Sequence, residues 1–349
     1  MAYTTIDKAD DYFNTVLYSG NGSSRSITGV GFQPDWVWIK SRNSSYSHIV
    51  HDINRAATKE LKINGTNAEG TDTNGFTSFD SDGFSLGSGG AVNNNGTNFV
   101  SWSWLASNST ASNSDGSITS TVSANQTSGF SVVTTTGTGS AATIGHGLGA
   151  APAMIIGKDR DRNSTEWRIY HKKLPNASNI LFFNNSNAEQ SGNSATWNGT
   201  DPTSSVFSVG TSGDVNSSGS KFVFYCFAEK KGFSKFGKYI GNGSTDGAFL
   251  FTGFKPALWI VKRVDSGDNW IMFDNKRSTS EGFNRNNVLL LPNLDQGENT
   301  NDGEVDFLSN GIKMRATKTE FNGNNGQYVY MAFAENPFVT STGIPSPAR

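Results

Sequence analysis

The segment that decides the fold is Phe32-Gln-Pro-Asp-Trp-Val-Trp-Ile-Lys40, because two similar segments follow it along the chain. The second copy is Leu148-Gly-Ala-Ala-Pro-Ala-Met-Ile-Ile-Gly-Lys158, and the third is Phe254-Lys-Pro-Ala-Leu-Trp-Ile-Val-Lys262. In all three copies the lysine follows the proline by six residues. The run between them is apolar at both alternating positions, which is typical of a β-strand buried on two sides.

Other blocks repeat around these segments in the same order. A Gly-x-Gly tripeptide precedes each copy, and it begins at residues 20, 137 and 241, so the spacings are 117 and 104 residues. A second apolar block follows each lysine, and a third block closes each copy, beginning at Phe99, Phe222 and Tyr328. Self-similarity at this spacing indicates three tandem units of about 100 residues.

The sequence predicts an all-β protein made of three tandem antiparallel β-sandwich domains of the jelly-roll or lectin-like kind. Flattened barrels are the alternative architecture. The evidence is that short aromatic and β-branched runs are bounded by Gly, Asn, Asp and Ser. The predicted parts are an N-terminal arm (1–14), a first repeat (15–106), a flexible polar linker (107–117), a second repeat (118–229), a third repeat (230–338) and a C-terminal tail (339–349).

The composition argues against several classes of function. The 349 residues include 28 basic and 30 acidic ones, and a net charge of -2 argues against nucleic-acid binding and against a polybasic membrane module. Charged residues make up 17% of the chain, against about 25% in ordinary globular proteins. Since there is no basic stretch with an apolar run behind it and no run of eighteen apolar residues, we expect neither a signal peptide nor membrane insertion.

Common catalytic sequence motifs are missing, so we expect no enzymatic activity and no cofactor. The sequence has no G-x-S-x-G, H-E-x-x-H or P-loop motif. Cys226 aligns with Ser103 and Ala332, which predicts a small buried residue rather than a nucleophile. His48 and His51 lie three apart, so on a strand they point to opposite faces, and we expect packing roles and no metal site.

One tryptophan falls outside the shared blocks. Trp197 lies in a turn-rich stretch, where an exposed indole beside Asn198 and Asp201 would suit stacking on a sugar ring. These three residues are the candidate glycan contacts, and the alternative is a loop tryptophan packed on its own domain. The repeated lysines are expected to be solvated strand ends or charges that guard a sheet edge against aggregation. These lysines are Lys40, Lys158 and Lys262.

Three segments carry a resemblance to a known family. They are Tyr12-Phe-Asn-Thr-Val-Leu-Tyr-Ser-Gly-Asn-Gly22, the Gly-Phe-x-Pro-Asp-Trp-Val-Trp-Ile-Lys-x-Arg block at 31–42, and Tyr330-Met-Ala-Phe-Ala-Glu-Asn-Pro-Phe338. The chain resembles repeat-bearing virion structural proteins of marine bacteriophages, notably those that infect cyanobacteria and ocean heterotrophs. The resemblance covers nearly the whole chain, and the second copy departs from it most. It implies a virion protein and carries over no catalytic residues, because the family pattern defines none.

The resemblance implies a non-enzymatic virion structural protein, foremost a cyanophage-like tail fibre or tail-associated component that contributes to adsorption on the host surface. The alternatives are a capsid-surface decoration protein and a free carbohydrate-binding or glycan-degrading protein. We expect synthesis in the host cytoplasm and a place on the virion surface, with the terminal arms attached to other tail or capsid proteins. A host surface glycan is a further expected partner, and self-association is open.

Overall fold

The computed structural model describes residues 2–278, 284–300 and 303–345, and nearly all of its regular structure is β-strand. Each α-helix in this part of the chain has only four residues, and one short 3-10 helix precedes the first strand. The helical elements are η1 (Ala9–Asp11), α1 (Gly90–Asn93), α2 (Ser194–Trp197), α3 (Gly213–Asn216) and α4 (Thr319–Asn322). The protein is therefore all-β, as its sequence predicts.

Three large antiparallel sheets make up most of the molecule. The first contains, in spatial order, β1 (Phe13–Ser19), β9 (Asn98–Trp104), β3 (Trp36–Ser41), β4 (Ile49–Asp52), β5 (Lys59–Lys62) and β6 (Gly70–Thr71). The second contains β10 (Ala111–Asn113), β11 (Ser120–Asn125), β12 (Phe130–Thr136), β18 (Lys221–Phe227), β14 (Met154–Asp159), β15 (Arg168–His171) and β16 (Leu181–Phe182). The third contains β19 (Ser234–Ile240), β26 (Gln327–Pro337), β21 (Phe254–Arg263) and β22 (Ile271–Asp274).

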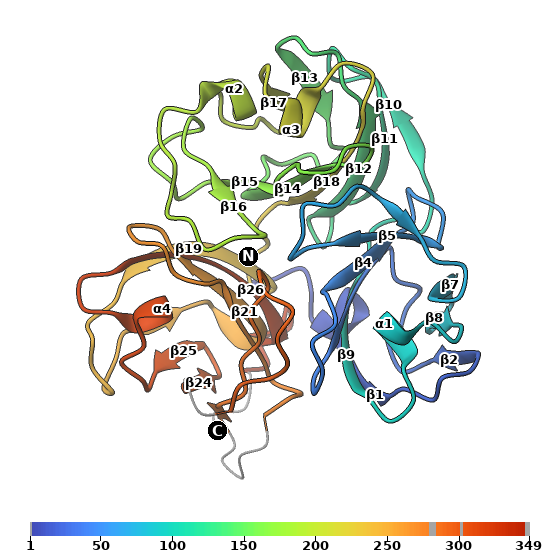
Figure 1. The fold of residues 1–349 in the computed structure, drawn as a ribbon. Helices are drawn as coiled ribbons and strands as arrows, with labels where there is room; N and C mark the ends of the chain where they lie inside the picture. Colours follow the sequence, from blue (N-terminus) through green and yellow to red (C-terminus); the bar gives the residue numbers. More distant parts are fainter. Residues whose placement is uncertain (1, 279–283, 301–302, 346–349) are drawn as a thin grey trace.

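Three smaller antiparallel sheets lie toward the outside of the large ones (Figure 1). The first consists of β2 (Arg25–Ile27), β8 (Gly83–Leu86) and β7 (Phe76–Asp80). The second consists of β13 (Ala142–Gly145) and β17 (Val206–Val209). The third consists of β20 (Phe249–Phe251), β25 (Gly311–Met314), β24 (Val305–Leu308) and β23 (Arg285–Asn286).

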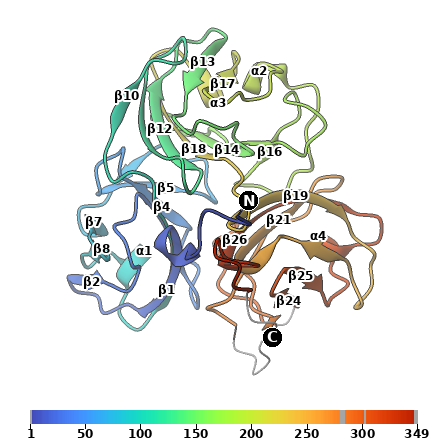
Figure 2. The same cartoon turned by 180° about the vertical axis from the view of Figure 1, so that it is seen from behind.

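One strand order occurs in all three large sheets. It is β1-β9-β3-β4 in the first, β12-β18-β14-β15 in the second and β19-β26-β21-β22 in the third. The register also agrees, because Trp36 pairs with Trp104, Met154 with Phe227 and Leu258 with Phe333. We call the strands β1–β9 unit 1, β10–β18 unit 2 and β19–β26 unit 3. Figures 1 and 2 show the three units arranged around a common centre.

The centre of the molecule is an aromatic core that all three units share. Trp104, Phe227 and Phe333 occupy the same position in their units, and their ring centroids lie 5.6, 5.8 and 6.5 Å apart. Trp36 of unit 1 also stacks on Tyr225 of unit 2, with centroids 4.5 Å apart. Burial of such large rings is the strongest source of packing energy in a protein. The inner faces of the three large sheets therefore form one hydrophobic core, and their outer faces pack toward the smaller sheets.

A buried asparagine explains why Gly-x-Gly recurs before each copy. In unit 1 the side chain of Asn93 accepts a hydrogen bond from Asn21 N (3.1 Å) and donates to Ser23 O (2.8 Å) and Gly87 O (2.7 Å). This side chain thus replaces the missing ladder partners of three loop backbone groups. Glycine is required at position 20 because a Cβ there would collide with the backbone of Asn93 and Asn94. Asn216 and Asn322 make the corresponding bonds in units 2 and 3.

The segments outside the repeats are more ordered than the sequence suggests. Residues 111–113 of the predicted linker form β10, which pairs with β11 and extends the second sheet. The predicted N-terminal arm does not project outward, because Tyr3 and Thr4 donate hydrogen bonds to backbone carbonyls of unit 3 and Ile6 lies in the shared core. Ser341 of the predicted tail donates to Asp7, so the described part of the tail contacts the arm. Residues 346–349 of that tail lie outside the described residues.

Candidate functional site

The predicted glycan-binding tryptophan is buried. Only 1% of Trp197 is exposed, and its ring lies in the core of unit 2 between Tyr170, Phe207 and Phe224. No ring face is left for a sugar, so the expectation of an exposed indole is wrong, and the alternative of a tryptophan packed on its own domain holds. The absence of a side chain at Gly157 makes room for the ring of Phe224, which a Cβ would approach to 2.8 Å.

The two polar residues beside it remain on the surface. Asn198 ends α2 in a left-handed conformation with φ of 52°, which asparagine tolerates better than most residues. The carboxylate of Asp201 accepts a hydrogen bond from the Tyr170 hydroxyl (3.1 Å). Each residue therefore has a local structural role, and the three predicted contact residues do not form a common binding surface.

The histidines and the cysteine occupy packing positions, as the sequence indicates. His48 and His51 are buried, and His51 stacks on Phe76 with centroids 4.5 Å apart. His48 accepts a hydrogen bond from Trp38 at Nδ1 (2.9 Å), so its Nε2 carries the proton that faces Leu291 O (3.1 Å). Cys226 is buried, and burial raises the pKa of its thiol.

The three repeated lysines are not solvated, which corrects the prediction made for them. Lys40, Lys158 and Lys262 are each 0% exposed, and burial lowers the pKa of each from 10.5 to about 8. Their ammonium groups donate to backbone carbonyls instead of water. Lys158 reaches Thr66 O of unit 1 (3.4 Å), and Lys262 reaches Ser186 O of unit 2 (3.3 Å). Lys40 donates to Ser41 O (2.8 Å) and Ser44 O (3.1 Å) of its own unit, whereas Lys158 and Lys262 help to hold a loop of the preceding unit.

That loop has the form Asn-x-x-x-x-Glu in every unit, at residues 64–69, 184–189 and 293–298. We call these segments the junction loops. The glutamate N–H of each loop donates to a backbone carbonyl of the neighbouring unit. These bonds are Glu69 N to Arg160 O (2.8 Å), Glu189 N to Val264 O (2.9 Å) and Glu298 N to Arg42 O (2.6 Å). Since the last bond joins unit 3 to unit 1, the three units form a closed ring.

A second set of bonds repeats around the ring in the same sense. Trp167, Trp270 and His48 occupy equivalent positions, each at the start of the apolar block that follows the repeated lysine. Each points a ring nitrogen at a backbone carbonyl of the preceding unit. The bonds are Trp167 Nε1 to Lys62 O (2.9 Å), Trp270 Nε1 to Phe182 O (2.7 Å) and His48 Nε2 to Leu291 O (3.1 Å). The junction between units 3 and 1 therefore carries the same two sets of bonds as the other two junctions.

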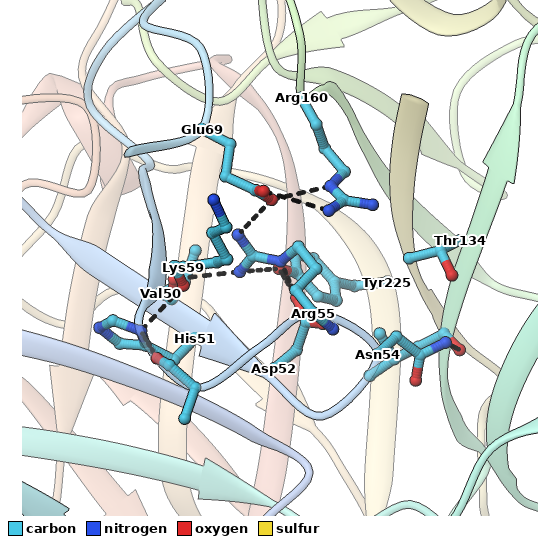
Figure 3. Close-up of polar contacts among 12 residues, drawn as sticks. Val50, His51, Asp52, Asn54, Arg55, Lys59, Glu69, Thr134, Arg160 and Tyr225 are labelled. Carbon is cyan, nitrogen blue, oxygen red and sulfur yellow. Dashed lines mark hydrogen bonds and ion pairs between the residues drawn. The ribbon is translucent and has the colours of Figure 1, made fainter. Parts of the chain in front are cut away.

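Figure 3 shows the buried polar cluster at the junction of units 1 and 2. Asp52 accepts from Arg55 Nε (2.6 Å) and from the hydroxyl of Tyr225 of unit 2 (2.7 Å). Arg55 also donates to Glu69 (3.2 Å), and Glu69 accepts from Arg160 Nε of unit 2 (2.7 Å). Burial alone would raise the pKa of Glu69, but the bonds and charges of the two arginines outweigh it and lower this pKa.

The junction of units 3 and 1 carries the same cluster. Asp274 accepts from Arg277 Nε (2.5 Å) and from Trp102 Nε1 of unit 1 (3.1 Å). Glu298 of the junction loop accepts from Arg277 (3.3 Å) and from Arg42 Nε of unit 1 (2.6 Å). The side chains of Asp274 and Arg277 are fully buried, so the pair is held by its geometry and by complete hydrogen bonding.

The junction of units 2 and 3 is different. His171 replaces the aspartate, and it accepts from Lys173 N at Nδ1 and faces Tyr330 O of unit 3 with Nε2, both at 3.2 Å. Leu174 takes the place of the first arginine, and Val264 takes the place of the second. Of the aspartate, the two arginines and the glutamate that form the cluster at the other junctions, only the glutamate is present here, as Glu189. This junction is therefore the one place in the described ring where the arginines are missing.

Sequence reasoning did not identify these junction residues. The Asn-x-x-x-x-Glu spacing and the Asp-x-x-Arg pairs at 52–55 and 274–277 were the signals that could have found them. Within the described residues, no group of three or more His, Cys, Asp and Glu side chains is placed to hold a metal ion. In the same residues, no helix is both long and apolar enough to cross a membrane.

Comparison with known proteins places the chain in a family but gives it no named relative. No curated protein and no solved structure matches it. One family model matches residues 8–337, which includes the three units and their junctions. The chain therefore belongs to the family described as Domain of unknown function (DUF7483).

Proposed function

We propose that the protein is a non-enzymatic structural protein of a bacteriophage virion, foremost a tail fibre or tail-associated component that takes part in host adsorption. In this proposal its three units are tandem β-sandwich domains of jelly-roll or lectin-like type. The support for sandwiches is that Val37 and Ile39 of the large sheet share a hydrophobic cluster with Phe76 and Phe84 of the small sheet in unit 1. Unit 2 has an equivalent cluster.

The observation that carries the proposal is the closed ring. Unit 3 binds unit 1 through the same backbone and side-chain contacts that join the other units. A single chain thus presents three related outer faces around one approximate threefold axis. This arrangement suits attachment on the axis of a trimeric fibre or at a threefold position of a particle. There a single chain would match a threefold symmetry that otherwise requires three copies of a protein.

The use of reactive side chains also supports a structural role. Groups that commonly carry catalysis are placed in packing and junction contacts, including His48, His171 and the Asp52–Arg55 pair. Burial lowers the pKa of His171 to about 4, so this residue is neutral and serves as a hydrogen-bonding bridge between units. The burial of Trp197 removes the observation that favoured a glycan-binding protein.

Electron cryo-microscopy of purified particles of a phage that encodes this chain tests the proposal. The expected result is density for a three-lobed ring, together with peptides of the chain in the mass spectrum of the particles. Density at the tail would support the adsorption role, and density over the capsid lattice would make the protein a decoration protein. Particles that lack both the density and the peptides would overturn the proposal.

A further inference from the structure

A cavity lies at the junction of units 2 and 3, where the arginines are missing. Its volume is about 290 Å³, and its walls include Leu174 and Glu189 of unit 2 and Tyr239, Ile240 and Val264 of unit 3. Leu174 and Val264 are buried, Tyr239 is half-buried, and Ile240 is 64% exposed at the rim. The cavity therefore has an apolar floor and an aromatic wall, and its charged groups are Glu189 and two solvent-exposed lysines, Lys173 and Lys238.

The other two junctions show what normally fills this volume. At the junction of units 1 and 2, the positions of Leu174 and Val264 hold Arg55 and Arg160, and both guanidinium groups bond to Glu69. At the junction of units 3 and 1, Arg277 and Arg42 bond to Glu298 in the same way. The chain thus contains two filled examples of the site that is open in the third place.

The acidic group has been kept although both of its arginine partners have been replaced. Glu189 accepts a hydrogen bond from the amide of Asn179, and no Lys or Arg forms an ion pair with it among the described residues. Burial raises the pKa of Glu189, whereas the arginines lower that of Glu69. The positive charge of Lys238 lowers the pKa of Glu189, but Lys238 forms no ion pair with it. Among the described residues no charged side chain donates a hydrogen bond to this half-buried carboxylate, and a guanidinium group that did so would recover free energy.

We propose that this cavity receives an arginine side chain of a partner protein, whose guanidinium group pairs with Glu189. The planar fork of arginine matches the carboxylate, its methylene stem suits Leu174 and Val264, and its face can stack on Tyr239. The contact completes the cluster that the chain itself completes at the other two junctions. This inference deepens the proposed function, because it names how a neighbouring virion protein is held, and for the partner's identity it rests on that function.

Binding of small probes to the full-length protein tests the inference without any particle. N-acetyl-L-arginine amide is titrated against the protein by isothermal calorimetry or by chemical-shift perturbation, beside N-acetyl-L-citrulline amide, which has the same shape and no charge. We expect millimolar binding of the arginine probe and binding of the citrulline probe that is weaker by about tenfold. Glu189→Gln should weaken binding of the arginine probe by a similar factor. Glu60→Gln, which removes a carboxylate of unit 1 whose pKa is also raised by burial, should not.

A variant that fills the cavity gives a second readout. Val264→Arg supplies the missing guanidinium from within, so it should abolish probe binding, and its thermal unfolding shows whether it folds. Equal binding of the two probes, undiminished binding by Glu189→Gln, or no binding of the arginine probe would each overturn the inference. Since these titrations need no particle, probe binding together with absence from purified particles would reject the virion proposal and leave the arginine site standing.

Discussion

The hydroxyl of Tyr225 donates a hydrogen bond of 2.7 Å to Asp52, across the junction between units 2 and 1. At the junction of units 1 and 3 the corresponding donor is Trp102, which bonds to Asp274 (3.1 Å). In unit 3 the register places Met331, which has no hydrogen to donate, at the position of Tyr225 and Trp102. Where the donor is lost, the aspartate is lost as well, so the two residues occur together at two junctions and are both absent from the third.

Removal of the Tyr225 hydroxyl should weaken the first junction without creating a large cavity. Tyr225→Phe leaves Asp52 bonded to Arg55 but takes away one of its hydrogen bonds in a buried site. We expect the free energy of unfolding to fall by about 1–3 kcal/mol. Urea denaturation followed by tryptophan fluorescence measures this change. Tyr46→Phe is the control, since no hydrogen bond from its hydroxyl occurs in the described structure, and it should change stability by less than about 0.5 kcal/mol.

The junction of units 2 and 3 should reject an aspartate that has no arginine beside it. His171→Asp places a carboxylate in a buried site with no arginine to bond it, and we expect a loss of about 3 kcal/mol in the free energy of unfolding at pH 7. Addition of Leu174→Arg should recover much of this loss, because it rebuilds the pair seen at Asp52 and Asp274.

His171→Asn is the matched variant for this experiment. Its side chain is neutral and can still accept a hydrogen bond from Lys173 N, so its cost should be clearly smaller than that of His171→Asp. Equal losses of stability for the two variants would show that the loss comes from the changed shape of the side chain rather than from the missing arginine. A double-mutant cycle of His171→Asp and Leu174→Arg measures the coupling directly.

The buried lysines predict that the protein becomes more stable in mildly alkaline solution. Burial lowers the pKa of Lys40, Lys158 and Lys262 from 10.5 to about 8, so above pH 8 the unfolded chain binds more protons than the folded one. Stability must then rise with pH, by up to about 1.4 kcal/mol per pH unit for each lysine. Because burial raises the pKa of Cys226, ionisation of the unfolded thiol opposes this trend.

The experiment is therefore done in a Cys226→Ala background between pH 7 and about 9, because burial also raises the pKa of several tyrosines and those of the unfolded chain are still largely protonated below about pH 9. Unfolding in urea at each pH gives the slope. Replacement of one lysine by methionine should reduce the slope by roughly a third, whatever it does to stability at pH 7. A stability that is flat or falling over this range would show that the lysines keep their ordinary pKa in the folded protein.

Truncation of Trp197 should act on folding and not on sugar binding. The ring is buried among Tyr170, Phe207 and Phe224, so Trp197→Ala leaves a large cavity in unit 2. We expect a loss of about 3–5 kcal/mol in the free energy of unfolding. Thermal unfolding measures the loss. Trp197→Phe, which keeps an apolar ring, should cost much less, and a stable Ala variant with altered glycan affinity would contradict the assignment.

The β-class and the alignment of equivalent strands could be predicted because they depend on local sequence. Periodic apolar blocks fix strands, and three copies of a block fix which residues correspond, as Cys226 with Ser103 and Ala332 shows. The contacts between units could not be predicted in the same way. The bond from Trp102 to Asp274 joins residues 172 positions apart, and a single sequence holds no information on which strand faces which.

The candidate site was missed for a related reason. A lysine at a strand end is usually solvated, and only the neighbouring unit, whose loop carbonyls cover Lys158 and Lys262, makes burial possible. A tryptophan in a turn-rich stretch is ambiguous until its neighbours in space are known, here Tyr170, Phe207 and Phe224. In both cases tertiary contacts, rather than local preference, decided the environment of the side chain.

The shared core predicts that the three units unfold together. Trp104, Phe227 and Phe333 meet at the centre, so loss of any one unit would expose the aromatic faces of the other two. Calorimetry should show a single transition whose calorimetric and van't Hoff enthalpies agree. Phe333→Ala should lower the transition temperature as a whole, with a cost of about 3–5 kcal/mol, instead of splitting it. Separate transitions in the unaltered protein would mean that the ring is a chain of independent domains, and the closed junction between units 3 and 1 would then contribute little to stability.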